Sequence, residues 1–238
     1  MGIRVTEIMV PVDGLTVACD EGEARRLLDR HAEFDVIPIG RDGQISSCVE
    51  RGAGGSRGLG LGDLAGDSTT IVELVRILRD RPWIFVLGER SIVGYVHFSD
   101  LNKEAVKIPL FALLSGVERR LAERARPLIG DASLDVVLGK NRADCVRKTM
   151  KKMREGRAEL GWVDLLYFRE IARFAAHFGR TNITDEQIGQ LNQLRNHVVH
   201  TAGSLVGSHE EVVRLSEVVG LCASIDPGAA PGATDVMG

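Results

Sequence analysis

Residues 83–97 read WIFVLGERSIVGYVH, and this stretch decides the fold of the first half of the chain. An apolar run, a short turn signal at Gly88–Arg90 and a second apolar run predict a β-hairpin. Residues 34–49 show the same pattern of two apolar runs, with Asp42–Gly43 as a strong tight-turn signal between them. Because an extended run and a helical pattern precede each hairpin, the sequence predicts two copies of a β-α-β-β unit, each covering the other's apolar face.

The segments that precede the two hairpins are read from their apolar spacing. In the first copy, residues 15–19 form a short extended run and residues 21–31 a helix; in the second, residues 69–72 lead into a helix that ends near Arg79. Residues 52–62, between the copies, are rich in glycine. A glycine-rich loop can cradle a phosphate, but this one lacks the lysine and the spacing of phosphate-binding loops, so we expect a flexible connector.

Two stretches carry a resemblance to a known family. Asp35–Ile39 followed by Asp42–Gly43, and Gly94–Leu101, are similar to the two repeats of a CBS-domain pair. The resemblance covers residues 3 to 106. It implies a regulatory module that binds an adenosine nucleotide (AMP, ADP or ATP) in the cleft between the repeats.

In that family a Gly-x-x-Thr-x-x-Asp stretch places the aspartate on the ribose hydroxyls. The second repeat keeps Gly94 and Asp100 and has His97 at the threonine position. In the first repeat, Glu50 and Ala53 stand at the threonine and aspartate positions, so the resemblance implies at most one ordinary ribose site. The candidate ligand-binding residues are therefore Gly94, His97 and Asp100. The alternative is that Asp100 only caps the helix that follows it.

From Pro109 onward strand signals nearly vanish, and apolar residues recur at helical spacing. Thr184 and Gln187 form a capping box that predicts the start of one helix. The other predicted helices span residues 109–124, 141–157, 161–178 and 208–222, with a short one beginning near 133. The fold class is therefore α+β, a tandem β-α-β-β pair followed by an all-α helical bundle. We expect domains at residues 1–106 and 107–225 and a disordered tail at 226–238.

The helix that begins after Thr184 ends in the run Arg195-Asn196-His197-Val198-Val199-His200. Arginine holds a phosphate with a planar fork of donors, and histidine exchanges a proton near neutral pH. The Arg-Asn-x-x-x-His pattern and its helical setting, over residues 109 to 224, resemble the HEPN superfamily of all-helical nucleotide- and RNA-processing domains. By that resemblance, many members are metal-independent endoribonucleases that work as dimers, and others only bind or assemble.

The HEPN resemblance implies catalytic roles for Arg195, Asn196 and His200. His200 would act as general base or acid, and Arg195 would offset the charge that grows on the phosphate. Asn196 would orient the imidazole or a phosphate oxygen. The 2′-hydroxyl of RNA would attack the neighbouring phosphorus, giving a 2′,3′-cyclic phosphate and a 5′-hydroxyl.

Helix geometry sets the alternatives for this motif. Asn196 and His200 are one turn apart on an ideal helix, whereas Arg195 points to the side, so we expect a homodimer to gather two Arg-His sets. The alternative is a surface cation and a histidine near a helix C-terminus, where both suit the helix dipole. His197 adds a second imidazole, but no third ligand lies nearby in sequence, so we expect no metal.

The predicted helix at residues 141–157 is strongly basic. In the sequence its cations face only Asp144 and Glu155 as acids. Such a run can neutralise the phosphates of RNA, and the alternative is a solvated helix face. The candidate RNA-binding residues are Arg147, Lys148, Lys151, Lys152 and Arg154.

Composition narrows the class of protein. The 238 residues carry a formal charge of -3, which gives no global attraction to nucleic acid or to an anionic membrane. The chain lacks a signal-peptide core and an apolar run long enough to span a membrane, and its four cysteines are scattered, so we expect a cytoplasmic protein.

The functional expectation is a ligand-regulated endoribonuclease that needs no cofactor for catalysis. Its expected partners are RNA, an adenosine nucleotide and a second copy of the chain. The alternatives are a non-enzymatic nucleotide-sensing adaptor, whose helical half only dimerises or binds a partner, and an antitoxin-like component of a hetero-complex.

Overall fold

The computed structural model describes residues 2–41, 44–156, 159–200 and 203–227. The chain forms two compact units. Unit 1 comprises residues 1–109 and 204–216, and unit 2 comprises residues 110–203 and 217–238. The domain boundaries expected at 106/107 and 225/226 stay predictions.

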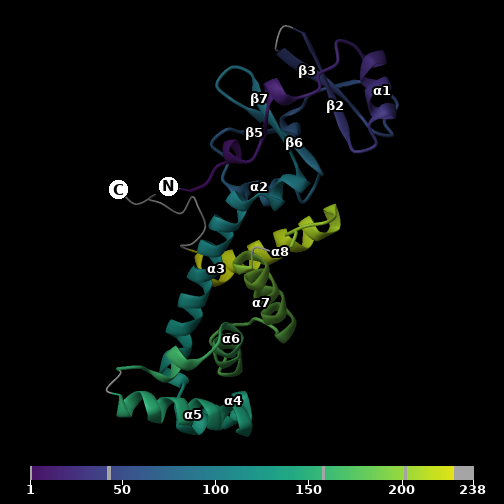
Figure 1. The fold of residues 1–238 in the computed structure, drawn as a ribbon. Coiled ribbons are helices and arrows are strands. Elements are labelled where there is room, and N and C mark those ends of the chain that lie inside the picture. The colour runs from purple at the N-terminus through teal and green to yellow at the C-terminus, as the bar shows by residue number, and fades with distance from the viewer. Residues whose placement is uncertain (1, 42–43, 157–158, 201–202, 228–238) are drawn as a thin grey trace. The chain divides into compact units, whose positions relative to one another are not determined.

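Unit 1 contains the two expected helix-hairpin copies (Figure 1). In the first, α1 (Glu21–Arg30) precedes the antiparallel strands β2 (Val36–Arg41) and β3 (Gln44–Glu50). In the second, α2 (Ile71–Ile77) precedes the antiparallel strands β6 (Trp83–Leu87) and β7 (Ile92–His97). Both predicted hairpins are confirmed.

The extended residues before each helix also match between the copies. Ala18 forms a parallel bridge to Ile39 of β2, and β5 (Leu64–Gly66) pairs in parallel with β6. Each copy therefore has the predicted order of elements, although the first copy begins with an isolated bridge at Ala18. The extended run expected at residues 69–72 is wrong, because the strand is β5 and α2 already begins at Ile71. The expected turn at Asp42–Gly43 lies outside the described residues.

Two further strands complete the sheets. β1 (Val10–Pro11) pairs with β7 in a sheet of order β1-β7-β6-β5, and β4 (Arg57–Gly58) pairs with β3 in a sheet of order β2-β3-β4. Gly94 of β7 lies opposite Pro11, and a Cβ there would come within 2.8 Å of the Val10 carbonyl oxygen. Glycine at this position therefore lets the backbone of β1 approach β7 closely.

The two copies share one hydrophobic cluster. It joins Val36 and Cys48 of the first copy to Trp83, Phe85 and Ile92 of the second. Burying apolar faces against each other is the main favourable term in folding, so each copy stabilises the other. This is the packing that the repeated pattern predicts.

A buried ion network orders part of the glycine-rich segment between the copies. Asp63 is 3% exposed and accepts hydrogen bonds from Arg57 at 2.6 Å, from the Gly60 N–H at 2.8 Å and from Arg81. Both guanidinium groups lie over the Trp83 ring, 5.8 and 5.9 Å from its centre. The expectation of a flexible connector is therefore wrong for β4 and the 3-10 helix η3 (Leu61–Asp63), because their charged side chains pair with each other.

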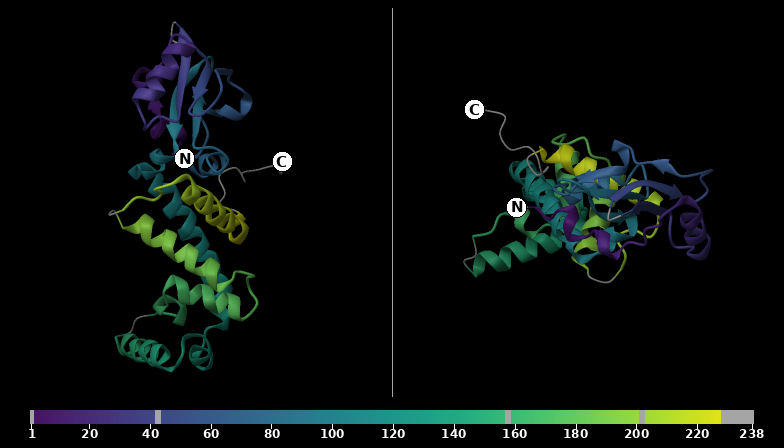
Figure 2. Two further views of the ribbon diagram at one scale, coloured as in Figure 1. Left: turned by 90° about the vertical axis from the view of Figure 1, so that its right-hand side faces the viewer. Right: turned by 90° about the horizontal axis from the view of Figure 1, so that it is seen from above.

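From Glu104 onward, the described residues form helices and no strands (Figure 2). Residues from 110 onward in α3 and from 217 onward in α8 belong to unit 2. Within unit 2, α4 packs on α5 and α6, and α6 packs on α7. The helices are α3 (Glu104–Ala125), α4 (Asp131–Leu138), α5 (Lys140–Glu155), α6 (Phe168–His177), α7 (Asp185–Val199) and α8 (His209–Ile225). The α+β class with a helical C-terminal half is confirmed.

One predicted helix, residues 161–178, is wrong in its N-terminal half. Only the 3-10 helix η6 (Trp162–Leu165) forms there, and α6 begins at Phe168. The Asp164 carboxylate accepts from the Gly161 N–H at 2.7 Å, and Glu170 accepts from the Tyr167 N–H at 2.9 Å. These two local caps start two separate helices, because each satisfies backbone donors that a continuous helix would use.

The start of the predicted tail is anchored. Asp226 is buried, its N–H donates to the Cys222 carbonyl at 3.0 Å, and its carboxylate lies 3.5 Å from Arg120 and 3.8 Å from Arg119. Residues 228–238 lie outside the described residues. None of the described helices combines the length and the apolar character that a membrane span requires.

Candidate functional site

A cavity of about 330 Å³ opens between the two copies in unit 1. Two of the three candidate ligand-binding residues, His97 and Asp100, line it. The wall from the first half of the unit is mostly apolar, and the second copy supplies most of the polar groups. The lining residues are Val10, Leu15, Thr16, Glu33, Phe34, Val36, Ile37, Pro38, Tyr95, His97, Ser99 and Asp100.

Both ring nitrogens of His97 are held. Nε2 lies 2.9 Å from Asp35 Oδ2, and Nδ1 lies 2.8 Å from the Ser99 hydroxyl. His97 ends β7 and caps the 3-10 helix η4 (Phe98–Asn102), since its Nδ1 also accepts from the Ser99 N–H at 3.3 Å. The ring is 22% exposed, so it is fixed between the two copies and still faces the cavity.

Asp100 lies in η4 and has two partners. Its Oδ2 accepts from the His97 N–H at 2.8 Å, and its Oδ1 lies 2.9 Å from Lys103 Nζ. The alternative prediction that Asp100 is the N-cap is wrong, because His97 is the cap and Asp100 returns a hydrogen bond to it. A carboxylate has about four acceptor positions, so these two contacts leave capacity for a ligand hydroxyl at a side chain that is 12% exposed.

Gly94, the third candidate, is not among the residues that line the cavity. It is buried beneath β1, where its lack of a side chain permits strand pairing. Its position explains why the chain needs glycine there without any role in ligand contact. Gly94 therefore positions β1 and β7, two elements that supply the cavity wall.

Sequence reasoning missed several groups at the cavity. The CBS resemblance includes Asp35 but gives it no role, yet its carboxylate lies 2.9 Å from Nε2 of His97, 62 residues later in the chain. Tyr95 lies between the charged groups: burial, followed by the charges of Asp35 and Asp100, raises its pKa far above the usual range. The phenol therefore stays protonated and can donate a hydrogen bond. These contacts form only when the two copies pack together, so the sequence of either copy alone does not predict them.

The other candidate site is the C-terminal end of α7 in unit 2. Thr184 caps this helix as predicted, accepting from the Gln187 N–H at 3.2 Å while Gln187 accepts from the Thr184 N–H at 2.9 Å. The helix ends at Val199, and His200 is its C-cap. The His200 N–H still donates to the Asn196 carbonyl at 2.9 Å, so these residues lie one helical turn apart, as expected.

The three side chains of this motif differ in their surroundings. Arg195 is 38% exposed, and its Nε lies 3.5 Å from Glu118 Oε2 on α3. Asn196 and His200 are exposed. One chain therefore orients the guanidinium but leaves the amide and the imidazole open to solvent.

The candidate RNA-binding residues of α5 fall into two groups. Arg147 is surrounded by carboxylates: Asp131 at 2.6 Å, Asp144 at 3.0 Å and Asp135. Hydrogen bonds that Arg147 donates to Asp135 and then to Asp131 chiefly raise the pKa of Arg147 beyond its already high value. The sequence did not reveal these partners because both lie on α4, which packs against α5. Arg147 is therefore the least available of the five for a phosphate.

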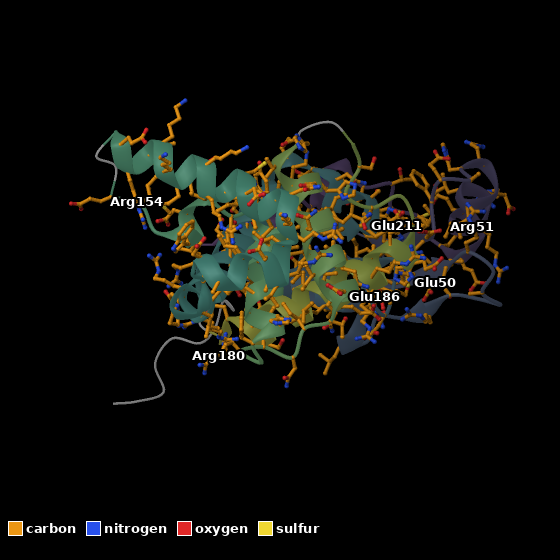
Figure 3. The ribbon with its side chains drawn as sticks, turned by 90° about the horizontal axis from the view of Figure 1, so that it is seen from below. Glu50, Arg51, Arg154, Arg180, Glu186 and Glu211 are labelled. Atoms are coloured by element: carbon orange, nitrogen blue, oxygen red, sulfur yellow. The ribbon has the colours of Figure 1, made fainter. Side chains whose placement is uncertain are left out.

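The other four candidate RNA-binding residues of α5 lie at the surface. Lys148, Lys151 and Lys152 are exposed and, within the part of the chain that the structure describes, form no ion pair. Arg154 lies at the C-terminal end of α5, and its guanidinium is 5.5 Å from the centre of the Trp162 ring (Figure 3). This end of the helix is the best candidate for phosphate contacts.

Comparison of the chain with models of protein families, with curated proteins and with solved structures found no match. The resemblances to CBS-domain pairs and to the HEPN superfamily stay predictions. Among the described residues, no group of three or more His, Cys, Asp or Glu side chains is placed to hold a metal ion. A function can therefore be inferred only from the geometry of the cavity and of the C-terminal end of α7.

Proposed function

We propose that the chain is a ligand-regulated, metal-independent endoribonuclease, in which the cavity of unit 1 binds an adenosine-type ligand and the helical half cuts RNA. The observation that carries the proposal is a cavity lined by both copies, with His97 and Asp100 in its wall. Ligand sites are typically concave and mostly apolar, with a few fixed polar groups. The cavity of unit 1 has this composition.

The lining suggests how the ligand is held. Phe34 and Tyr95 offer aromatic surface for a base, and Asp100 offers acceptor positions for ribose hydroxyls. His97, fixed by Asp35 and Ser99, restricts the space beside Asp100. The resemblance to CBS-domain pairs points to the same kind of ligand.

The proposed chemistry uses Arg195, Asn196 and His200. The 2′-oxygen of RNA attacks the adjacent phosphorus as an imidazole takes its proton. The bond from phosphorus to the 5′-oxygen breaks, and this oxygen takes a proton from a second imidazole. Arg195 offsets the charge on the phosphate, and its contact with Glu118 restricts the guanidinium before RNA arrives.

His197 is a second imidazole on the same helix, but a second copy of the His200 imidazole requires a second copy of the chain. In a two-fold dimer each group occurs twice, so two α7 ends facing each other would supply two histidines and two arginines. The exposure of Asn196 and His200 supports this arrangement, since a pairing surface must be open in a single chain. A ligand can shift the dimer between two arrangements only if its affinity for one arrangement differs from its affinity for the other.

Cleavage of a defined RNA in the presence of EDTA tests the enzymatic part. We expect a 2′,3′-cyclic phosphate product, no cleavage of the same oligonucleotide with a 2′-deoxy residue at the cut site, and loss of activity in His200→Ala and Arg195→Ala. Unchanged cleavage in both variants, in preparations free of other nucleases, would contradict the mechanism. Calorimetry with adenosine and AMP tests the cavity, with Asp100→Asn as the binding variant and the exposed Asp67→Asn as its control.

The alternative is a ligand-sensing adaptor without enzymatic activity. The observations that favour it are the neutralisation of Arg147 by three carboxylates and the pairing of Arg195 with Glu118. Ligand binding together with inert RNA would identify the adaptor. A stable hetero-complex on purification would instead indicate a component of an antitoxin-like pair.

A further inference from the structure

The cavity of unit 1 has an unusual charge for a nucleotide site. Among its described lining residues are two carboxylates, Glu33 and Asp100, and no lysine or arginine. A third carboxylate, Asp35, contacts the lining residue His97. Phosphate sites in proteins use arginine, lysine or converging backbone donors, because a phosphate carries strong negative charge.

The imidazole of His97 already has protein partners on both ring nitrogens. Nε2 lies 2.9 Å from Asp35 Oδ2, and Nδ1 lies 2.8 Å from the Ser99 hydroxyl and accepts from the Ser99 N–H at 3.3 Å. Neither ring nitrogen is therefore free to bind a phosphate, and the carboxylate of Asp35 stands next to the ring.

Two cations close to the lining are already engaged. Lys103 pairs with Asp100 at 2.9 Å and also donates to the carbonyl oxygen of Ile8, and Arg51 donates to the carbonyl oxygen of Phe34 at 2.9 Å. Neither lines the cavity. The charge of Lys103 offsets that of Asp100, and Glu33, which lies 3.0 Å from His31 Nδ1, remains as a carboxylate of the lining.

We infer that the cavity selects the uncharged nucleoside over its phosphorylated forms, so that the regulator of this protein is adenosine-like and carries no phosphate. The inference rests on the proposed function, since it names the ligand class of the same cavity. The apolar wall, the aromatic rings of Phe34 and Tyr95 and the acceptor oxygens of Asp100 suit a base and a ribose. A phosphate would meet like charge, which opposes binding by an amount that grows as the separation and the local dielectric fall.

The size of the effect follows from Coulomb's law. A phosphate with about two negative charges, placed several ångströms from Glu33 and Asp35 near the protein surface, loses roughly tenfold or more in affinity relative to the nucleoside. Screening by salt weakens such repulsion between partly exposed charges. The preference for adenosine over AMP should therefore narrow as salt concentration rises.

Isothermal titration of the full chain with adenosine, AMP and ATP tests the inference. We expect adenosine to bind about tenfold or more tightly than AMP, and Glu33→Gln to reduce this ratio by about threefold. Glu89→Gln is the matched control, because Glu89 is an exposed carboxylate in the turn between β6 and β7 and does not line the cavity. Glu89→Gln should leave the ratio unchanged.

The possible results separate the two proposals. Tighter binding of AMP or ATP than of adenosine overturns the selection of an uncharged ligand and leaves the ligand-binding proposal standing. Binding of none of the three probes overturns both. A ratio that is the same in the wild type, Glu33→Gln and Glu89→Gln contradicts the electrostatic basis of the inference.

Discussion

The cavity of unit 1 and the C-terminal end of α7 in unit 2 present their polar groups in opposite ways. In the cavity, His97 and Asp100 each have at least two partners and line a concave space. At the end of α7, among the residues that the structure describes, Arg195 has an ion-pair partner, and His200 is exposed. The first region is a cavity built within one chain, whereas the second is an exposed helix end that, under the proposal, needs further groups to enclose RNA.

This difference separates the two parts of the proposal. Fixed polar groups in a cavity are preorganised, so ligand binding should depend on single residues of one chain. The α7 end becomes a site only when another surface covers it, so catalysis should depend on assembly as well as on Arg195 and His200. Substitutions at each site can therefore separate the dependence of ligand binding on single residues from the dependence of catalysis on assembly.

Replacing the proposed proton-transfer group should have the largest effect. We expect His200→Ala to lower the rate of metal-free RNA cleavage by about 100- to 10,000-fold, because general acid-base catalysis contributes an effect of that size. His177→Ala is the control, since His177 is an exposed histidine on α6. Equal rates in the two variants would show that the α7 end takes no part in proton transfer.

The buried ion network of unit 1 gives the largest expected effect on stability. Asp63→Asn removes the buried carboxylate that Arg57 and Arg81 share, although Arg57 keeps its contact with Glu50, and we expect a loss of about 2 kcal/mol in the free energy of unfolding. Denaturant unfolding of this variant and of the exposed Asp67→Asn measures the difference. A loss as small as that of Asp67→Asn would mean that the network contributes little to the stability of the fold.

The same network makes the stability of the folded chain depend on pH. Hydrogen bonds from Arg57 chiefly hold the pKa of Asp63 well below its usual range, so the folded state binds the proton less readily than the unfolded state does. This contribution to stability is complete above the unfolded pKa of about 4 and is lost as pH falls through the lower folded pKa. Wild-type stability should therefore fall more steeply than that of Asp63→Asn below about pH 4.

Replacing Asp100 should have a smaller effect, which changes ligand affinity and leaves RNA cleavage without ligand nearly unchanged. We expect Asp100→Asn to weaken adenosine binding by about 10- to 100-fold, because hydrogen bonds to a charged acceptor contribute about 1.5 to 3 kcal/mol. RNA cleavage without ligand should stay within about twofold of the wild type, since a twofold change corresponds to less than half of 1 kcal/mol. Calorimetry and the cleavage assay, run on the same preparation, separate a local effect from general damage to the fold.

The basic helix should give the smallest effect. Replacing Lys151 and Lys152 together by alanine removes two exposed cations, and the slope of log affinity for RNA against log salt should fall by about 1.5. Arg147→Ala should leave that slope unchanged, because Arg147 is neutralised by carboxylates of α4 and α5. Equal slopes for the wild type and the lysine variant would remove α5 from the RNA surface.

The sequence predicted features whose causes are local. The repeated hairpins, the cap at Thr184 that begins α7, and the separation of Asn196 and His200 by one helical turn all follow from residues close in the chain. The main local error was the helix at 161–178, where the caps at Asp164 and Glu170 prevailed over a continuous apolar stripe.

Contacts between distant residues were the part that the sequence did not reveal. Asp35 meets His97, and Asp131 and Asp135 meet Arg147, only after the elements that carry them have packed. Apolar periodicity predicts which face of an element is buried but not which charged side chain on a neighbouring element it meets. Whether a charged side chain is free to bind a ligand or a phosphate therefore depends on which neighbours it meets after packing.

The most direct test of the account is the rate of metal-free RNA cleavage measured against adenosine concentration, in the wild type and in Asp100→Asn. We predict that adenosine changes the wild-type rate with a midpoint at its dissociation constant, and that the midpoint moves about 10- to 100-fold higher in the variant. If adenosine binds the cavity but the rate stays constant in both proteins, the cavity does not regulate cleavage, and the central claim is contradicted.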